Sequence, residues 1–74
     1  MKALQEIEVI FDKVYFKQLM KLKKWTNQDL ANETGISVNT ICNYMKGSRL
    51  PNSGGLYKVA IALDASMEDL LMEI

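Results

Sequence analysis

Apolar residues recur along the chain at the spacing of an α-helix, most clearly between residues 13 and 24. This stretch predicts an amphipathic helix with Asp12 as its N-cap, whose core side carries Tyr15, Phe16, Leu19 and Leu22. Four lysines fall on the opposite side, at about 100° per residue: Lys13, Lys17, Lys21 and Lys24. They form either an ordinary solvated face or a surface that faces an anion.

Two shorter helices are predicted next. Residues 26–29 read Thr-Asn-Gln-Asp, the form of a capping box, and predict a second helix that ends at Thr34 because Gly35 readily adopts a left-handed conformation. Ser37 is then a suitable N-cap for a third helix with apolar positions at Val38, Ile41, Tyr44 and Met45. The turn between the two helices is about three residues long.

The remaining segments complete an all-α pattern. Residues 46–52 form a polar loop, Asn52 and Ser53 offer an N-cap for a fourth helix to about Leu63, and a second capping box at 66–69 predicts a final helix with Met67, Leu70, Leu71 and Ile74. Residues 4–11 alternate like a strand but also fit a helix, and we favour an extended arm. The expected fold is a compact five-helix domain over residues 12–74 after an N-terminal arm of residues 1–11.

Composition narrows the function classes. The 74 residues leave room for one domain, and the absence of a long apolar run or a signal-like start predicts a soluble, cytoplasmic protein without membrane contact. There is no histidine and one cysteine, Cys42, so we expect no internal disulfide, no metal and no cofactor. A thiol redox role for Cys42 lacks a resolving partner.

The net charge is zero, but the charges are segregated. Residues 13–58 hold eight basic and two acidic residues, a net charge of 8 − 2 = +6. The two flanking segments, residues 1–12 and 59–74, together hold one basic and seven acidic residues, a net charge of 1 − 7 = −6. Such a distribution suits a protein with one anion-facing surface.

Two short helices joined by a glycine turn match the geometry of a helix-turn-helix, although an αα corner without DNA-binding function has the same outline. The segment TNQDLANETGISVNTICNYMKGSRLP resembles the lambda-repressor-like, Cro/CI-type helix-turn-helix of phage repressors and bacterial xenobiotic-response-element-type regulators. The similarity extends from about Asp12 to Ile74 and includes LYKVAIALDASMEDLL, which is similar to the fourth and fifth helices of that family.

The resemblance implies that the third helix enters the major groove of DNA, with base contacts from Ser37, Val38, Asn39 and Asn43. Asparagine pairs bidentately with adenine, serine donates or accepts, and valine contacts the thymine methyl group. Asn39 is the leading candidate, and the absence of arginine from this helix indicates an A·T-leaning site. Phosphate contacts are expected from Asn27, Gln28, Tyr44, Lys46, Ser48 and Arg49, with a further anion site at the backbone N–H groups near Gly54 and Gly55.

The chain departs from the family pattern at three positions. Met20 and Met45 stand where many members pair an arginine with a glutamate, and we expect the two methionines to touch. Asp64 stands where the family usually has glycine, so modest backbone strain is expected there. Trp25 is expected to anchor the core below the turn.

The sequence therefore predicts a DNA-binding transcriptional regulator, most simply a repressor, acting as a homodimer. The expected dimer interface is the apolar C-terminal helix or the N-terminal run of Ile7, Val9 and Phe11. The alternative is a protein-interaction module of antitoxin or anti-regulator type, which the zero net charge favours. An enzyme lacks the necessary catalytic groups.

Overall fold

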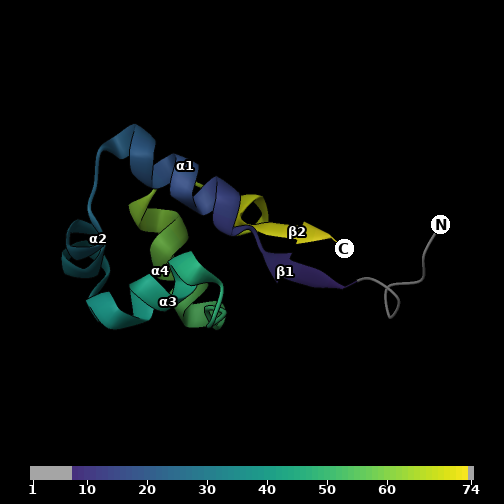
Figure 1. Ribbon diagram of the computed structural model, residues 1–74. Helices are drawn as coiled ribbons and strands as arrows, with labels where there is room; N and C mark the ends of the chain where they lie inside the picture. The colour runs from purple at the N-terminus through teal and green to yellow at the C-terminus, as the bar shows by residue number, and fades with distance from the viewer. Residues whose placement is uncertain (1–7, 74) are drawn as a thin grey trace.

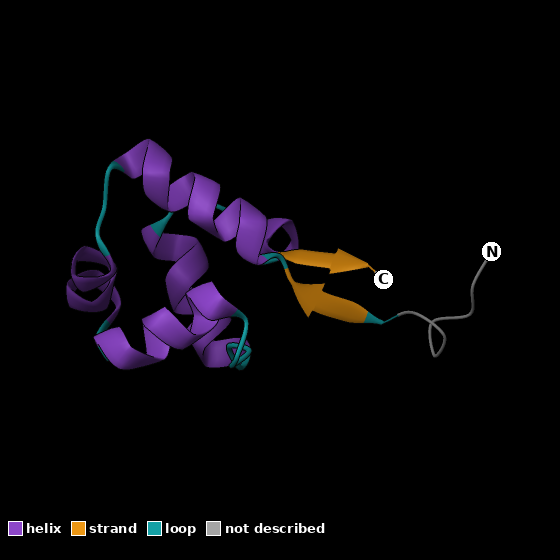
Figure 2. Ribbon diagram, viewed as in Figure 1, coloured by secondary structure: helices purple, strands orange, loops and turns teal. Residues whose placement is uncertain are grey.

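A computed structural model describes residues 8–73 of the protein. In chain order it contains β1 (Val9–Phe11), α1 (Lys13–Lys23), α2 (Asn27–Thr34), α3 (Val38–Lys46), α4 (Ser53–Ala62), the 3-10 turn η2 (Glu68–Leu70) and β2 (Leu71–Glu73). Figure 1 shows α1 lying along one side of the helical body, opposite α3, while the two strands leave the body together beside the start of α1. Figure 2 colours the helices and the strands differently and so distinguishes the helical body from the two-stranded β-ribbon that β1 and β2 form.

The predicted helix starts are confirmed, because local hydrogen bonds define them. The side chain of each predicted N-cap accepts a hydrogen bond from the backbone N–H three residues later, at Asp12, Thr26, Ser37 and Asn52. The Asp29 carboxylate also accepts from the N–H of Thr26 at 2.8 Å, which completes the capping box of α2. Gly35 closes α2 with a φ of 74°, in the left-handed region that glycine adopts without a steric penalty.

The core lies where all the helices meet. Its most deeply buried side chains come from α1, α2, α3, α4 and η2: Phe16, Leu30, Ile41, Val59 and Leu70. The buried line on α1 runs through Phe16 and Met20, and Leu22 lies about 200° further round the helix from Met20. The prediction that Leu22 belongs to the core side is therefore wrong, and 79% of its surface is exposed.

The predicted fifth helix is replaced by one 3-10 turn and a strand. The Ser66–Asp69 capping box forms, with the N–H of Asp69 donating to the Ser66 hydroxyl at 3.2 Å, but the helical turn ends at Leu70. The carbonyl of Leu70 accepts a hydrogen bond from the N–H of Asp12 at 2.7 Å, and the next three residues pair with β1. The backbone groups of β1 thus form hydrogen bonds with residues 71–73, which then cannot continue the helix. The capping box at 66–69 gives no indication of this pairing, because it acts over three residues only.

The two strands are antiparallel, with Val9 opposite Glu73, Ile10 opposite Met72 and Phe11 opposite Leu71. The extended arm is confirmed for residues 9–11, whereas Leu4, Ile7 and Ile74 lie outside the described residues. Phe11 belongs to the core, since its ring centroid lies 5.3 Å from that of Phe16. The last part of the expected arm therefore packs as part of the domain.

The family departures also have structural outcomes. Asp64 adopts a φ of 55°, the left-handed conformation from which strain was expected, and its carboxylate pairs with the Lys23 ammonium at 3.0 Å. Trp25 is half-buried against the core, as predicted. Met20 lies in the core and Met45 packs against it from α3, while direct contact between the two methionines stays a prediction.

Candidate nucleic-acid interface

One face of α3 carries polar side chains that are available to a ligand. Asn39, Asn43 and Lys46 are spaced at i, i+4 and i+7, so their side chains follow one line along the helix. Ile41 and Tyr44, on the opposite side, are buried. Packing of that side against the body therefore directs the polar line outward, and no side-chain hydrogen bond within residues 8–73 occupies Asn39 or Asn43.

The start of α3 contributes two more of the expected base-contacting residues. Ser37 is exposed, and its hydroxyl accepts from the N–H of Thr40 while lying 2.8 Å from the Thr40 hydroxyl. Val38 is 38% exposed. The capping interaction thus fixes Ser37 in position and leaves the small apolar surface of Val38 next to it.

The loop after α3 is held against the end of that helix. The Asn43 carbonyl accepts hydrogen bonds from the N–H groups of Ser48 and Arg49, at 3.1 and 3.4 Å. Gly47 makes this reversal with a φ of 78°. As a result Lys46, Ser48 and Arg49, all exposed, are gathered at one end of the polar line on α3.

The start of α2 is attached to the middle of α3. The side-chain amide of Asn27 donates to the Cys42 sulfur at 3.3 Å, and this bond sets the position of Asn27 beside α3. Gln28 is exposed, and its amide donates to the Asn32 side-chain oxygen at 2.9 Å, one turn further along α2. Each side-chain amide has two N–H groups, so each keeps a donor beyond the bond described.

Tyr44 differs from the other expected phosphate contacts. Only 4% of its surface is exposed, and its ring lies 6.2 Å from that of Phe11 in the core. Its hydroxyl reaches the start of α4, where a Cβ at Gly55 would lie 3.1 Å from it. The core thus holds the ring, so any phosphate contact from Tyr44 has to come from its hydroxyl.

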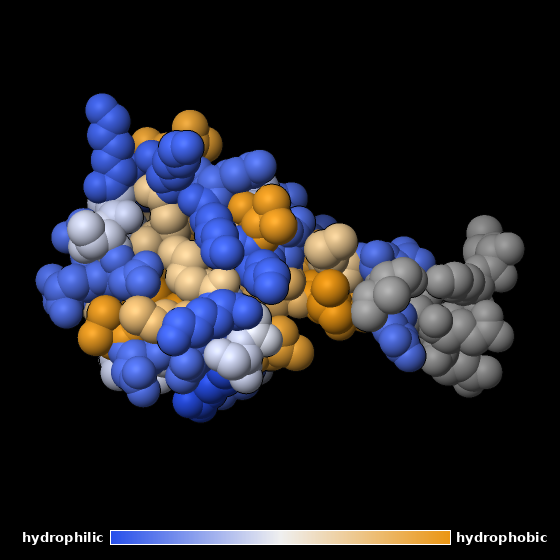
Figure 3. Space-filling model, viewed as in Figure 1, coloured by the Kyte–Doolittle hydropathy of each residue, from blue (hydrophilic) through white to orange (hydrophobic). Residues whose placement is uncertain are grey.

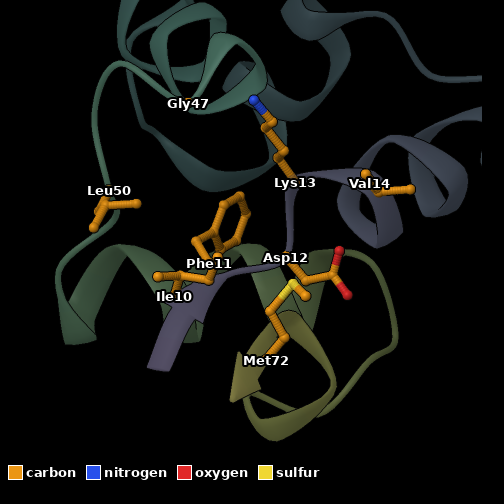
Figure 4. A pocket seen from close by; sticks show the side chains of 8 residues that line it. All are labelled: Ile10, Phe11, Asp12, Lys13, Val14, Gly47, Leu50 and Met72. Carbon is orange, nitrogen blue, oxygen red and sulfur yellow. The ribbon is translucent and has the colours of Figure 1, made fainter. Parts of the chain in front are cut away.

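Sequence reasoning did not connect Lys13 with α3. The Lys13 side chain lies over Gly47, with its ammonium 3.0 Å from the position that a Cβ would take (Figure 4). It therefore sits at the negative end of the α3 dipole, although it belongs to the first turn of α1, where a cation is disfavoured. A lysine in the first turn of a helix is unfavourable for that helix. This was the one signal in the sequence that the Lys13 side chain interacts with a different helix.

The electrostatic setting is simple. Across the part of the chain that the structure covers, the one ion pair joins Lys23 to Asp64, so neither Lys46 nor Arg49 is paired with a carboxylate there.

None of the helices in that part is long and apolar enough to cross a bilayer. Among the same residues, no three His, Cys, Asp or Glu side chains converge as metal ligands.

Comparison with known proteins agrees with this geometry. A family model described as helix-turn-helix matches residues 16–70, which is more than half of the chain. No curated protein matches the chain significantly. The protein belongs to the lambda-repressor-like, Cro/CI-type helix-turn-helix family, whose members are DNA-binding transcription regulators. The two helices and the turn that give the family its name are here α2, the Gly35 turn and α3.

Proposed function

We propose that the protein is a sequence-specific repressor that inserts α3 into the major groove of double-stranded DNA. The observation that carries the proposal is the outward line of Asn39, Asn43 and Lys46, bounded by the attached start of α2 and by the loop at 47–49. An α-helix fits the major groove, and a line of amides along it meets successive base edges.

In this proposal four residues read bases and six hold the backbone. Ser37, Val38, Asn39 and Asn43 face base edges. The side-chain carbonyl of Asn39 accepts from the adenine amino group, and its NH2 group donates to adenine N7. The phosphate contacts come from Asn27, Gln28, Lys46, Ser48, Arg49 and the hydroxyl of Tyr44. The Tyr44 hydroxyl ends beside Gly55 at the start of α4. The N–H of Gly55 already donates to the Asn52 side chain at 2.8 Å, so of the two glycines proposed for an anion site only Gly54 keeps an N–H that this cap does not use.

Repression requires only that the bound protein blocks access to a promoter, whereas activation requires a further contact with the transcription machinery. Recognition in the major groove is usually two-fold symmetric, so we further propose a homodimer on two half-sites about 34–36 Å apart. A reporter whose promoter contains the selected site should lose expression when the protein is present. A gain of expression would contradict the repressor assignment while leaving DNA binding intact.

The decisive experiment is selection of bound sequences from random duplexes, with the wild type and with Asn39→Ala. We expect Asn39→Ala to relax one base position per half-site, a loss of about 1–3 kcal/mol of discrimination there. Gln18→Ala, an exposed amide on α1 outside the proposed interface, is the matched control and should leave the selected sequence unchanged. An unchanged sequence preference for Asn39→Ala would show that α3 does not read bases.

Salt dependence separates the phosphate contacts from the rest of the surface. Lys46→Ala should reduce the slope of log affinity against log salt by about 0.9, because one fewer counterion is released. Lys58→Ala, an exposed lysine on α4, should keep the wild-type slope. If the wild type fails to bind duplex DNA even at low salt, the protein-interaction alternative takes precedence.

A further inference from the structure

Two hydroxyl groups meet at the start of α3. The side-chain oxygens of Ser37 and Thr40 lie 2.8 Å apart, so one hydroxyl donates its proton to the other. The Ser37 oxygen also accepts a hydrogen bond from the backbone N–H of Thr40 at 3.2 Å. Ser37 is exposed and Thr40 is half-buried, so Ser37 is the more accessible member of the pair for a ligand on α3.

These contacts use most of the bonding capacity of the Ser37 hydroxyl. A hydroxyl has one proton to donate and two lone pairs that accept. The N–H of Thr40 uses one lone pair of Ser37, and the contact with the Thr40 hydroxyl uses either the second lone pair or the proton. One bonding direction of Ser37 is left for a ligand. The position of the proton between the two hydroxyls decides whether Ser37 donates or accepts in that direction.

The two arrangements of the pair differ in where the Thr40 proton goes. If Thr40 donates to Ser37, both lone pairs of Ser37 are used and its own proton points outward. If Ser37 donates to Thr40, the Thr40 proton needs another acceptor. Ser37 Oγ is the one hydrogen-bond partner of the Thr40 hydroxyl among residues 8–73, so the second arrangement relies on water to accept that proton.

A ligand that covers α3 displaces this water. Figure 3 shows hydrophobic surface where the β-ribbon leaves the body, whereas the surface over α3 is mainly hydrophilic. A donor that loses its water without gaining an acceptor is destabilising, whereas hydroxyls that donate in one direction along a chain strengthen one another. Contact with DNA therefore favours the arrangement in which Thr40 donates to Ser37 and Ser37 donates outward.

We infer that Thr40 restricts Ser37 to the role of a hydrogen-bond donor, so that Ser37 rejects cytosine. The inference rests on the proposed function, in which Ser37 faces a base edge. In the major groove adenine, guanine and thymine each present at least one acceptor, whereas cytosine presents only its amino donor. Thr40 acts through Ser37 and is therefore a positioning residue for base recognition.

Selection of bound sequences from random duplexes tests the inference with variants at position 40. The wild type should select one position per half-site at which cytosine is disfavoured about three- to tenfold against the other bases. Thr40→Val keeps the shape of threonine and the N–H that donates to Ser37, but it has no hydroxyl, so Ser37 regains a lone pair. This variant should reduce the preference against cytosine to less than about twofold.

Thr40→Ser is the matched control, because it keeps a hydroxyl at the same place, and it should reject cytosine as the wild type does. A merely structural role of Thr40 would lower the affinity for all sequences together and leave the base preference unchanged. Circular dichroism of both variants should show the wild-type helix content. The same preference in Thr40→Val as in the wild type, or an equal relaxation in Thr40→Ser, would overturn the inference.

The Asn39→Ala variant, run in the same selection, keeps this outcome separate from that of the proposed function. If Asn39→Ala relaxes one position and Thr40→Val relaxes none, α3 reads bases and the inference alone is overturned. If the wild type selects no sequence, the proposed function and the inference are both overturned. The two variants should relax different positions, because Ser37 and Asn39 would each contact a base of their own.

Discussion

The side-chain amide of Asn27 donates a hydrogen bond to the sulfur of Cys42 over 3.3 Å, which joins the start of α2 to the middle of α3. The two residues are fifteen positions apart, and both are partly buried. This bond holds Asn27, one of the proposed phosphate contacts, at a defined place beside α3. In the proposed function, Cys42 would act through Asn27, as a positioning residue.

Replacing Cys42 with alanine should weaken DNA binding without abolishing it. The substitution removes the acceptor, and a net loss of about 0.5–1 kcal/mol in stability, with a two- to fivefold loss of affinity, is expected from one modest hydrogen bond. Cys42→Ser is the matched control, since its oxygen still accepts from Asn27. Equal affinities of the alanine and serine variants, measured by fluorescence anisotropy, would show that the bond does not position the interface.

Tyr44→Phe should separate the role of the hydroxyl from that of the ring. The ring is buried and remains, so the free energy of unfolding should change by less than about 1 kcal/mol. Affinity for duplex DNA should fall about two- to tenfold, because one hydrogen bond to a charged phosphate is lost. An unchanged affinity would assign Tyr44 to the core alone.

Gly47→Ala should destabilise the protein for two reasons. A left-handed φ of 78° costs an L-residue about 1–2 kcal/mol, and the new Cβ would lie 3.0 Å from the Lys13 ammonium. Gly35→Ala has a similar φ of 74° but meets no atom within 4 Å, so it isolates the backbone cost. In urea unfolding, Gly47→Ala should cost more than Gly35→Ala in the wild type and about the same in a Lys13→Ala background.

Phe11→Ala should cost about 3–5 kcal/mol of stability, the range for truncating a buried aromatic side chain. Phe11 is 7% exposed and packs against both Phe16 and Tyr44. Val9→Ala, two residues earlier in the same strand and 55% exposed, should change stability by less than about 0.5 kcal/mol. Similar unfolding midpoints for the two variants would show that the first strand is not part of the folded domain.

Much of the site was predictable because it depends on local chemistry. The caps at Asp12, Thr26, Ser37 and Asn52 act over three residues, and Gly35 closes α2 through its own φ. The spacing of Asn39 and Asn43 then places both on one side of α3, whatever surrounds the helix. Burial of the opposite side in the structure confirms that this side faces outward.

Contacts between distant segments were not predictable in the same way. The sequence by itself determined the four α-helices, their limits and the polar face of α3, since each follows from side chains within one or two turns. Tertiary structure decided that β1 and β2 replace a fifth helix, that Leu22 is exposed, that the ring of Tyr44 is buried and that Lys13 lies over Gly47. Those outcomes depend on contacts between residues that are far apart in the sequence. The spacing of residues within one helix or one capping box carries no information about such contacts.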